Sequence, residues 1–272
     1  MRYEPGRSGL DYLPCRYGAS KVLFRGPKRP LDMPYIACLG GAETYGRFVE
    51  RPFPDRLEDA LGLPCVNLGC LNAGIDVFAQ DPHVPDIAAG AQVTIIQVVP
   101  AQNMSNRLYA VHPRRNDRFL KPSVLLQTIY RDVDFAEFNF NKHMLMRLHD
   151  ISAERFEAVK AELREVWVAR MRMLLRRIGG KTVLLWLADR GPDTEADEMG
   201  SDPWFIGRAE IEAVRADVTE VVEVVASPEA LTRSTEEMIF AELDRPAAER
   251  TFGPAVHLEA ASALAPVLAP LV

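Results

Sequence analysis

The sequence predicts a single α/β domain built around a doubly wound parallel β-sheet. Two observations carry this prediction: five short apolar segments show little polar alternation, and helical patterns lie between them. Continuous apolar runs are typical of strands that are covered on both faces. Alternation of strands and helices along the chain favours parallel strands joined by right-handed crossovers. The 272 residues, 48% of them hydrophobic, suffice to bury a substantial core.

The five apolar segments are the predicted strands, at residues 35–39, 65–68, 93–99, 182–187 and 220–225. The predicted helices are 48–61, 84–89, 153–178, 208–216, 229–243 and 258–265. The longest of them has Ser152 as a suitable N-cap, and Gly179 follows its last residue. We expect Pro266 to end the final helix, because proline lacks the N–H that the next turn needs.

Two segments fall outside this alternation, and we assign both to the same domain, 1–272. Residues 1–33 form an N-terminal extension. Residues 102–150 follow the third strand and are too long for a simple loop, so we expect an insertion. It should fold over the carboxyl ends of the strands, where open α/β sheets bind ligands.

Composition narrows the class of protein. A net charge of −6 argues against nucleic-acid binding, which usually requires a basic surface. The N-terminus lacks the apolar core of a signal peptide, and no apolar run is long enough to span a membrane. We therefore expect a cytoplasmic protein with free thiols. We expect no metal or other cofactor, and a zinc site in particular is disfavoured because no histidine pairs with a cysteine at ligand spacing. The four cysteines are Cys15, Cys38, Cys65 and Cys70.

Functional residues in such a sheet are expected where the strands end. The first strand runs into Gly40-Gly41-Ala42, the second into a stretch from Asn67 to Gly74, and the third into Gln102-Asn103. His257 stands at the start of the last helix. The glycines permit a tight turn beside an anion, although an ordinary strand-to-helix turn also contains them.

These blocks, in this order, resemble the SGNH (GDSL-type) hydrolases over residues 35–268. The resemblance implies a three-layer SGNH- or flavodoxin-like fold and gives His257 the role of catalytic base. It also implies that an oxyanion or other anion is bound near Gly41, Ala42, Gly69, Gly74 and Asn103. Two departures weaken the implied activity. Ala42 stands where the family has its nucleophilic serine, and Pro254 stands where it has the acid before the histidine.

A second candidate site is a basic stretch in the insertion. Arginine binds carboxylate, sulfate and phosphate groups through two parallel hydrogen bonds, so the stretch is interpreted as a clamp for an anionic substrate. The alternative is a surface loop whose arginines pair with nearby Asp and Glu residues. The stretch also looks like an uncharacterised bacterial family, which brings no function with it. The predicted substrate-binding residues are Arg107, His112, Arg114, Arg115 and Arg118.

Three functional hypotheses follow. The first is acyl transfer or ester hydrolysis on a small anionic or glycan- or lipid-linked substrate, without the usual serine. The second is a catalytically inactive domain that binds a carbohydrate, another anionic ligand or a protein partner. The third is a transferase of sulfate or phosphate groups, although the chain contains no P-loop. The sequence predicts neither the substrate's identity nor the oligomeric state.

Overall fold

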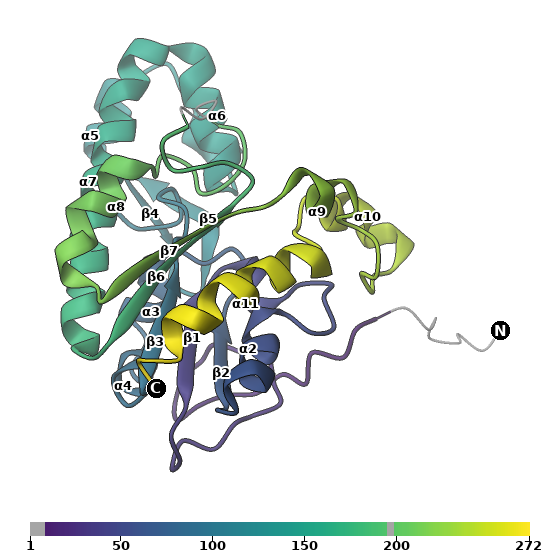
Figure 1. Ribbon diagram of the computed structural model, residues 1–272. Helices are drawn as coiled ribbons and strands as arrows, with labels where there is room; N and C mark the ends of the chain where they lie inside the picture. Colours follow the sequence, from purple (N-terminus) through teal and green to yellow (C-terminus); the bar gives the residue numbers. More distant parts are fainter. Residues whose placement is uncertain (1–8, 195–198) are drawn as a thin grey trace.

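The computed structural model describes residues 9–194 and 199–272, and its centre is a parallel sheet of five strands. The strand order is β2-β1-β3-β6-β7, and every neighbouring pair is parallel (Figure 1). The fold class predicted from the sequence is therefore confirmed. The strands are β1 (Ile36–Gly40), β2 (Cys65–Gly69), β3 (Val93–Gln97), β6 (Thr182–Ala188) and β7 (Glu220–Val225).

The first four strands are buried at every residue, which explains why their sequences lack alternation. The edge strand β7 alternates between exposed and covered residues. β3 ends at Gln97, two residues earlier than predicted.

Helices cover both faces of the sheet, and the sheet divides the core into two parts (Figure 1). One face packs against α2 (Phe53–Leu61), α9 (Pro228–Thr232) and α11 (Pro254–Leu268). The other packs against α3 (Ile75–Ala79), α4 (Val84–Ala89), α7 (Ala153–Ile178) and α8 (Arg208–Val214), which η2 (Arg215–Asp217) extends.

α7 has the boundaries that its sequence predicts. The Ser152 side chain accepts a hydrogen bond from the N–H of Arg155, which satisfies one free donor of the first turn. Gly179 ends the helix at φ 64°, a left-handed conformation that favours glycine.

Three helix predictions were wrong in extent. The predicted helix 48–61 begins only at Phe53, because Gly46 and Phe48 have positive φ angles and form a turn after the short α1 (Ala42–Tyr45). α11 continues through Pro266 to Leu268. The proline lies in the last turn, where it removes one hydrogen bond, while the buried face of the helix continues past it.

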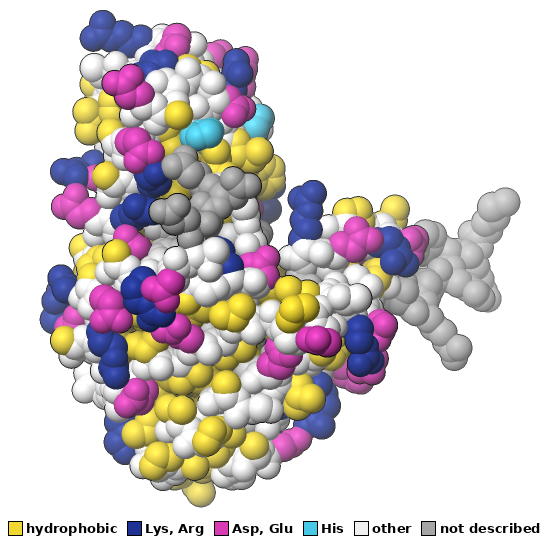
Figure 2. Space-filling view, turned by 45° about the horizontal axis from the view of Figure 1, so that its top comes forward, with side chains coloured by type: hydrophobic (Ala, Val, Ile, Leu, Met, Phe, Trp, Pro, Cys, Tyr) yellow, Lys and Arg dark blue, Asp and Glu magenta, His cyan; other side chains and the backbone are white. Residues whose placement is uncertain are grey.

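The predicted helix 229–243 is mostly irregular. After α9 the chain turns at Glu237 (φ 62°) and reaches the turn that follows α1. There the N–H of Ile239 donates to the carbonyl of Phe48. We call residues 227–253 the arm; it contains η3 (Glu242–Asp244) and α10 (Arg245–Ala248) and stands out from the body in Figures 1 and 2.

The insertion 102–150 has structure of its own. It consists of an antiparallel hairpin, β4 (Tyr109–His112) and β5 (Arg115–Pro122), followed by α5 (Val124–Ile129), η1 (Phe135–Glu137) and α6 (Asn141–Ile151). The fully buried Asn141 joins the insertion to the end of β3, since its Nδ2 donates to Gln102 O at 3.1 Å and to Asn116 O at 2.5 Å.

The N-terminal extension, described from residue 9 onward, packs beside α1. Its Arg25 is 5% exposed and donates hydrogen bonds to the carbonyls of Tyr45, Gly46, Val49 and Glu50. The extension therefore holds the turn that follows α1. Among the residues that the structure describes, no helix has the length and apolarity to cross a membrane.

Candidate functional site

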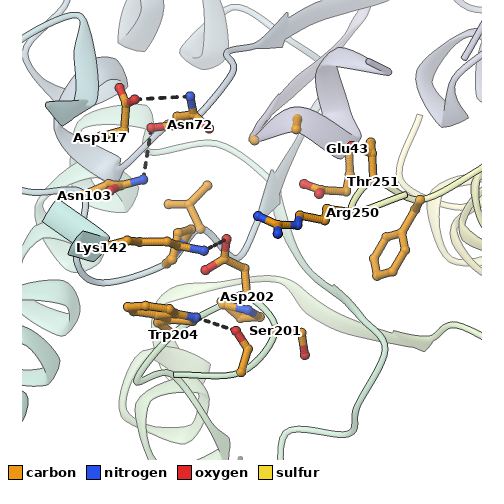
Figure 3. Close-up of a pocket in the computed structure, with 18 of the residues that line it drawn as sticks. Glu43, Asn72, Asn103, Asp117, Lys142, Ser201, Asp202, Trp204, Arg250 and Thr251 are labelled. Atoms are coloured by element: carbon orange, nitrogen blue, oxygen red, sulfur yellow. Dashed lines mark hydrogen bonds and ion pairs between the residues drawn. The ribbon is translucent and has the colours of Figure 1, made fainter. Parts of the chain in front are cut away.

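A cavity of about 900 Å³ lies at the carboxyl ends of the central strands. Its walls come from the turn after β1, the segment after β3, the insertion, the loop after β6, and the arm (Figure 3). From β1 the chain crosses to β2 on one side and then to β3 on the other, so the cavity sits at the switch point of the sheet. Open α/β sheets bind their ligands at this position.

Gln97 organises the turn after β1. Its Oε1 accepts hydrogen bonds from the N–H of Gly41 at 2.9 Å, the N–H of Thr44 at 3.2 Å and Oγ1 of Thr44 at 2.7 Å. Its Nε2 donates to Oε2 of Glu43 at 2.7 Å. Gly40 is required here, because a Cβ would lie 2.1 Å from Thr44 Oγ1. The buried amide thus fixes the backbone and one carboxylate oxygen together.

Glu43 is the carboxylate that this turn presents to the cavity (Figure 3). Desolvation raises the pKa of Glu43 above its usual range, and the nearby charge of Asp202 raises it further, while Gln97 and Lys142 act in the opposite direction. A half-buried carboxylate with a raised pKa is a stronger base than one in water. Sequence analysis missed Glu43, although it directly follows Ala42 in the turn.

The predicted anion-binding groups divide into two sets. Gly41, Ala42 and Asn103 line the cavity. Nδ2 of Asn103 donates one hydrogen bond to Asn72 O at 3.1 Å. Gly69 and Gly74 do not line it. A Cβ on Gly69 would lie 2.2 Å from the backbone nitrogen of Tyr45, and one on Gly74 would lie 1.6 Å from the Asn103 carbonyl oxygen.

The N–H groups of both excluded glycines are also occupied. That of Gly69 donates to Asn67 Oδ1 at 2.9 Å, and that of Gly74 donates to Asn116 Oδ1 at 3.0 Å. These two glycines therefore allow close packing of the backbone, and the structure does not place them at an oxyanion.

His257, predicted as the catalytic base, lies outside the cavity lining and is fully buried. Its Nδ1 accepts a hydrogen bond from the N–H of Phe53 at 3.2 Å. The two rings are stacked, with their centroids 6.2 Å apart. Burial lowers the pKa of His257 to about 3, with the charges of Arg56 and Arg25 acting in the same direction. The structure therefore places a neutral imidazole on the buried face of α11, outside the cavity lining.

None of the five residues of the predicted anion clamp lines the cavity. Arg107 pairs with the buried Glu162 and with Glu165 on α7. His112 accepts hydrogen bonds from the N–H groups of Arg114 and Arg115, both at 3.2 Å, inside the β4–β5 turn. The guanidinium of Arg118 lies 4.0 Å from the ring centroid of Phe140, a lining residue, while Arg118 itself is outside the lining. The charged residue that this stretch contributes to the lining is Asp117.

The cavity instead receives its charged groups from other segments. Lys142 of α6 lies with Nζ 2.8 Å from Oδ2 of Asp202 and 4.5 Å from the ring centroid of Trp204. At the end of β6, Asp189 Oδ1 accepts a hydrogen bond from Oγ of Ser201 at 2.5 Å. Lys142 lies on a helix and the other residues on the loop after β6, and only the fold brings them together.

The comparisons with known proteins identify a family. The model of a domain of unknown function (DUF6473) matches residues 1–272. The chain belongs to this family. No curated protein matches this chain. Among solved structures, the lipase Lip_vut3 from a goat rumen metagenome is similar to it, with a TM-score of 0.39 and 11% identity over 85% of this chain and 97% of that one. This similarity does not indicate an activity for the chain.

Proposed function

We propose that the cavity is the active site of a hydrolase that cleaves small acyl esters with a water molecule activated by Glu43. The observation that carries this proposal is the placement of Glu43. One of its oxygens is held by Gln97 at 2.7 Å, its pKa is raised, and it lies one residue after Ala42 at the switch point of the sheet. Since Ala42 has no hydroxyl and His257 is buried, neither group enters the proposed chemistry.

The reaction proceeds in two steps. In the first, the Glu43 carboxylate takes a proton from water as the water oxygen bonds to the acyl carbon, and the carbonyl oxygen becomes an oxyanion. The second N–H of the Asn103 amide is a donor for that oxyanion, because the first is used by Asn72. In the second step the oxyanion re-forms the carbonyl as the C–O bond to the alcohol breaks, and the leaving alkoxide takes the proton from Glu43. Transfer to an acceptor hydroxyl follows the same steps with that hydroxyl in place of water.

The test is hydrolysis of p-nitrophenyl acetate by purified wild type, Glu43→Gln and Glu229→Gln. The last variant is the control, because Glu229 is an exposed carboxylate outside the cavity lining. We expect Glu43→Gln to lower kcat by about a hundredfold or more, the usual contribution of a general base, and Glu229→Gln to leave it unchanged.

One result would contradict the proposal. Full activity in Glu43→Gln would remove Glu43 from the chemistry. If activity were then lost in Ser201→Ala, with a burst of p-nitrophenol in wild type, the nucleophile would be Ser201, activated by Asp189 at 2.5 Å. Ala42→Ser adds a hydroxyl at the cavity wall, and a gain of activity in that variant would support the placement of the site.

A ligand-binding domain without activity is the second candidate. The absence of a hydroxyl at Ala42 and the burial of His257 favour it. In that case wild type would not hydrolyse any ester, while compounds that occupy the cavity would still raise its Tm.

A further inference from the structure

Arg250 is a cation of the cavity whose side chain forms no ion pair with the residues that the structure describes. It lies on the arm, just after α10, and points into the cavity toward Asp202 and Glu43 (Figure 3). A short turn fixes its backbone. The N–H of Arg250 donates to Ala247 O at 3.3 Å, and Thr251 Oγ1 donates to the same carbonyl at 2.8 Å.

Lys142 is the second cation of the cavity, and it comes from the opposite wall. Its place is set by its neighbour Asn141, whose buried amide ties the first turn of α6 to the segment after β3. The ammonium group contacts the Asp202 carboxylate and lies over the Trp204 ring (Figure 3). An ammonium has three donors, so the ion pair with Asp202 leaves others for a ligand.

The carboxylates around these cations mostly have partners of their own. Asp202 accepts hydrogen bonds from Gln102 at 3.2 Å and from Lys142 at 2.8 Å. Asp117 accepts from Asn72 at 3.4 Å, and Asp189 accepts from Ser201 at 2.5 Å. Arg250 is therefore left with a guanidinium that faces the cavity and that no described carboxylate binds.

We infer that Arg250 and Lys142 form a binding site for the carboxylate or phosphate group of a ligand. A guanidinium binds either group through two parallel hydrogen bonds, and an ammonium adds a point charge. The position of Asp202 beside Lys142 makes it an internal competitor, because its carboxylate occupies one of the two cations when no ligand is bound.

This inference rests on the proposed function for the reaction and adds the class of substrate. The lining also contains apolar residues, among them Val98, Leu187 and Phe252. A substrate that fits is an ester whose acyl or alcohol part carries an anionic group at one end. Its anion would bind Arg250 and Lys142, while the ester carbonyl would lie beside Glu43 and Asn103.

The binding test uses succinate and inorganic phosphate as probes, with affinity measured by titration calorimetry at low ionic strength. The proteins are full-length wild type, Arg250→Gln, Asp202→Asn and Arg245→Gln. Arg245 is the matched control, since it lies on the same arm, outside the cavity lining, and pairs with Glu242. The two probes distinguish a carboxylate from a phosphate as the preferred group.

We expect Arg250→Gln to weaken binding of the preferred probe about ten- to a hundredfold, the usual effect of losing a hydrogen-bonded charge. Asp202→Asn should tighten binding several-fold, because it releases Lys142, and Arg245→Gln should have no effect. Binding that is equal in wild type and Arg250→Gln, or that weakens in Asp202→Asn, would overturn the inference, as would a failure of both probes to bind.

Turnover separates this inference from the proposed function. With wild type, mono-p-nitrophenyl succinate should have a lower KM than p-nitrophenyl acetate, and Arg250→Gln should remove this difference in KM. If neither ester is hydrolysed but the probes still bind through Arg250, the proposed function fails and the anion site stands. If both esters are hydrolysed with equal KM, the anion site fails and the hydrolase stands.

Discussion

Replacing Arg25 by methionine should destabilise the protein, because this one guanidinium satisfies the carbonyls of the turn that follows α1. Its Nη1 donates to Gly46 O at 2.6 Å and to Val49 O at 2.8 Å, both in buried surroundings. Two further bonds, to Tyr45 O and Glu50 O, are partly buried. The methionine keeps the apolar stem and removes all of these donors.

The size of the effect follows from the burial of the four acceptors. The two partly buried carbonyls can exchange Arg25 for water, so they contribute little. Of the two buried carbonyls, Gly46 O keeps the N–H of Val49 at 3.1 Å, so Val49 O alone loses its donor, at a cost of about 1 to 3 kcal/mol. Removal of a charge that burial has desolvated offsets part of this loss, and we expect a net decrease of about 2 kcal/mol in the free energy of unfolding.

Urea unfolding followed by circular dichroism measures this difference. The control is Arg16→Met, an exposed arginine in the same extension, for which we expect a change within about 0.5 kcal/mol. If Arg25→Met were as stable as Arg16→Met, the turn would hold its shape without the guanidinium. The N-terminal extension would then have no part in placing α1.

Two further predictions concern residues that the structure moved out of the site. His257→Asn should flatten the acid side of the pH–stability profile. In wild type the unfolded chain binds a proton on this histidine below pH 6.5, whereas the folded imidazole stays neutral because its pKa is lowered to about 3. The free energy of unfolding of wild type should therefore fall by about 2 kcal/mol between neutral pH and pH 5. Equal slopes for the two proteins in urea titrations between pH 7 and pH 5 would show that His257 is protonated in the folded state. Gly74→Ala should lower the free energy of unfolding by about 2 kcal/mol or more, because its Cβ would lie 1.6 Å from the Asn103 carbonyl oxygen. Gly180→Ala is the control, since a Cβ there would have no atom within 4 Å. Equal melting temperatures of the two variants would contradict the packing role of Gly74.

The sheet could be predicted because burial on both faces leaves a mark on each strand separately. Residues 65–68 and 182–187 are apolar without alternation, and no knowledge of their neighbours is needed to see it. The ends of α7 could also be predicted from local sequence, since Ser152 and Gly179 each act on the adjoining turn of the helix. The helix predicted at 229–243 failed because Ile239 bonds to Phe48, a residue far away in the sequence.

The candidate site could be predicted only in its location. The sequence by itself placed ligand binding at the strand ends and named Gly41, Ala42 and Asn103, which do line the cavity. It could not show that Gly69 and Gly74 serve packing, because the atoms they approach belong to other segments.

The tertiary structure alone decided which charged groups line the cavity. It buried His257 against Phe53, paired Arg107 with Glu162, and brought Lys142 and Arg250 to one cavity from segments more than a hundred residues apart. Whether a titratable side chain is buried, paired or open to a ligand depends on contacts between distant segments, and such contacts leave no periodic pattern along the chain.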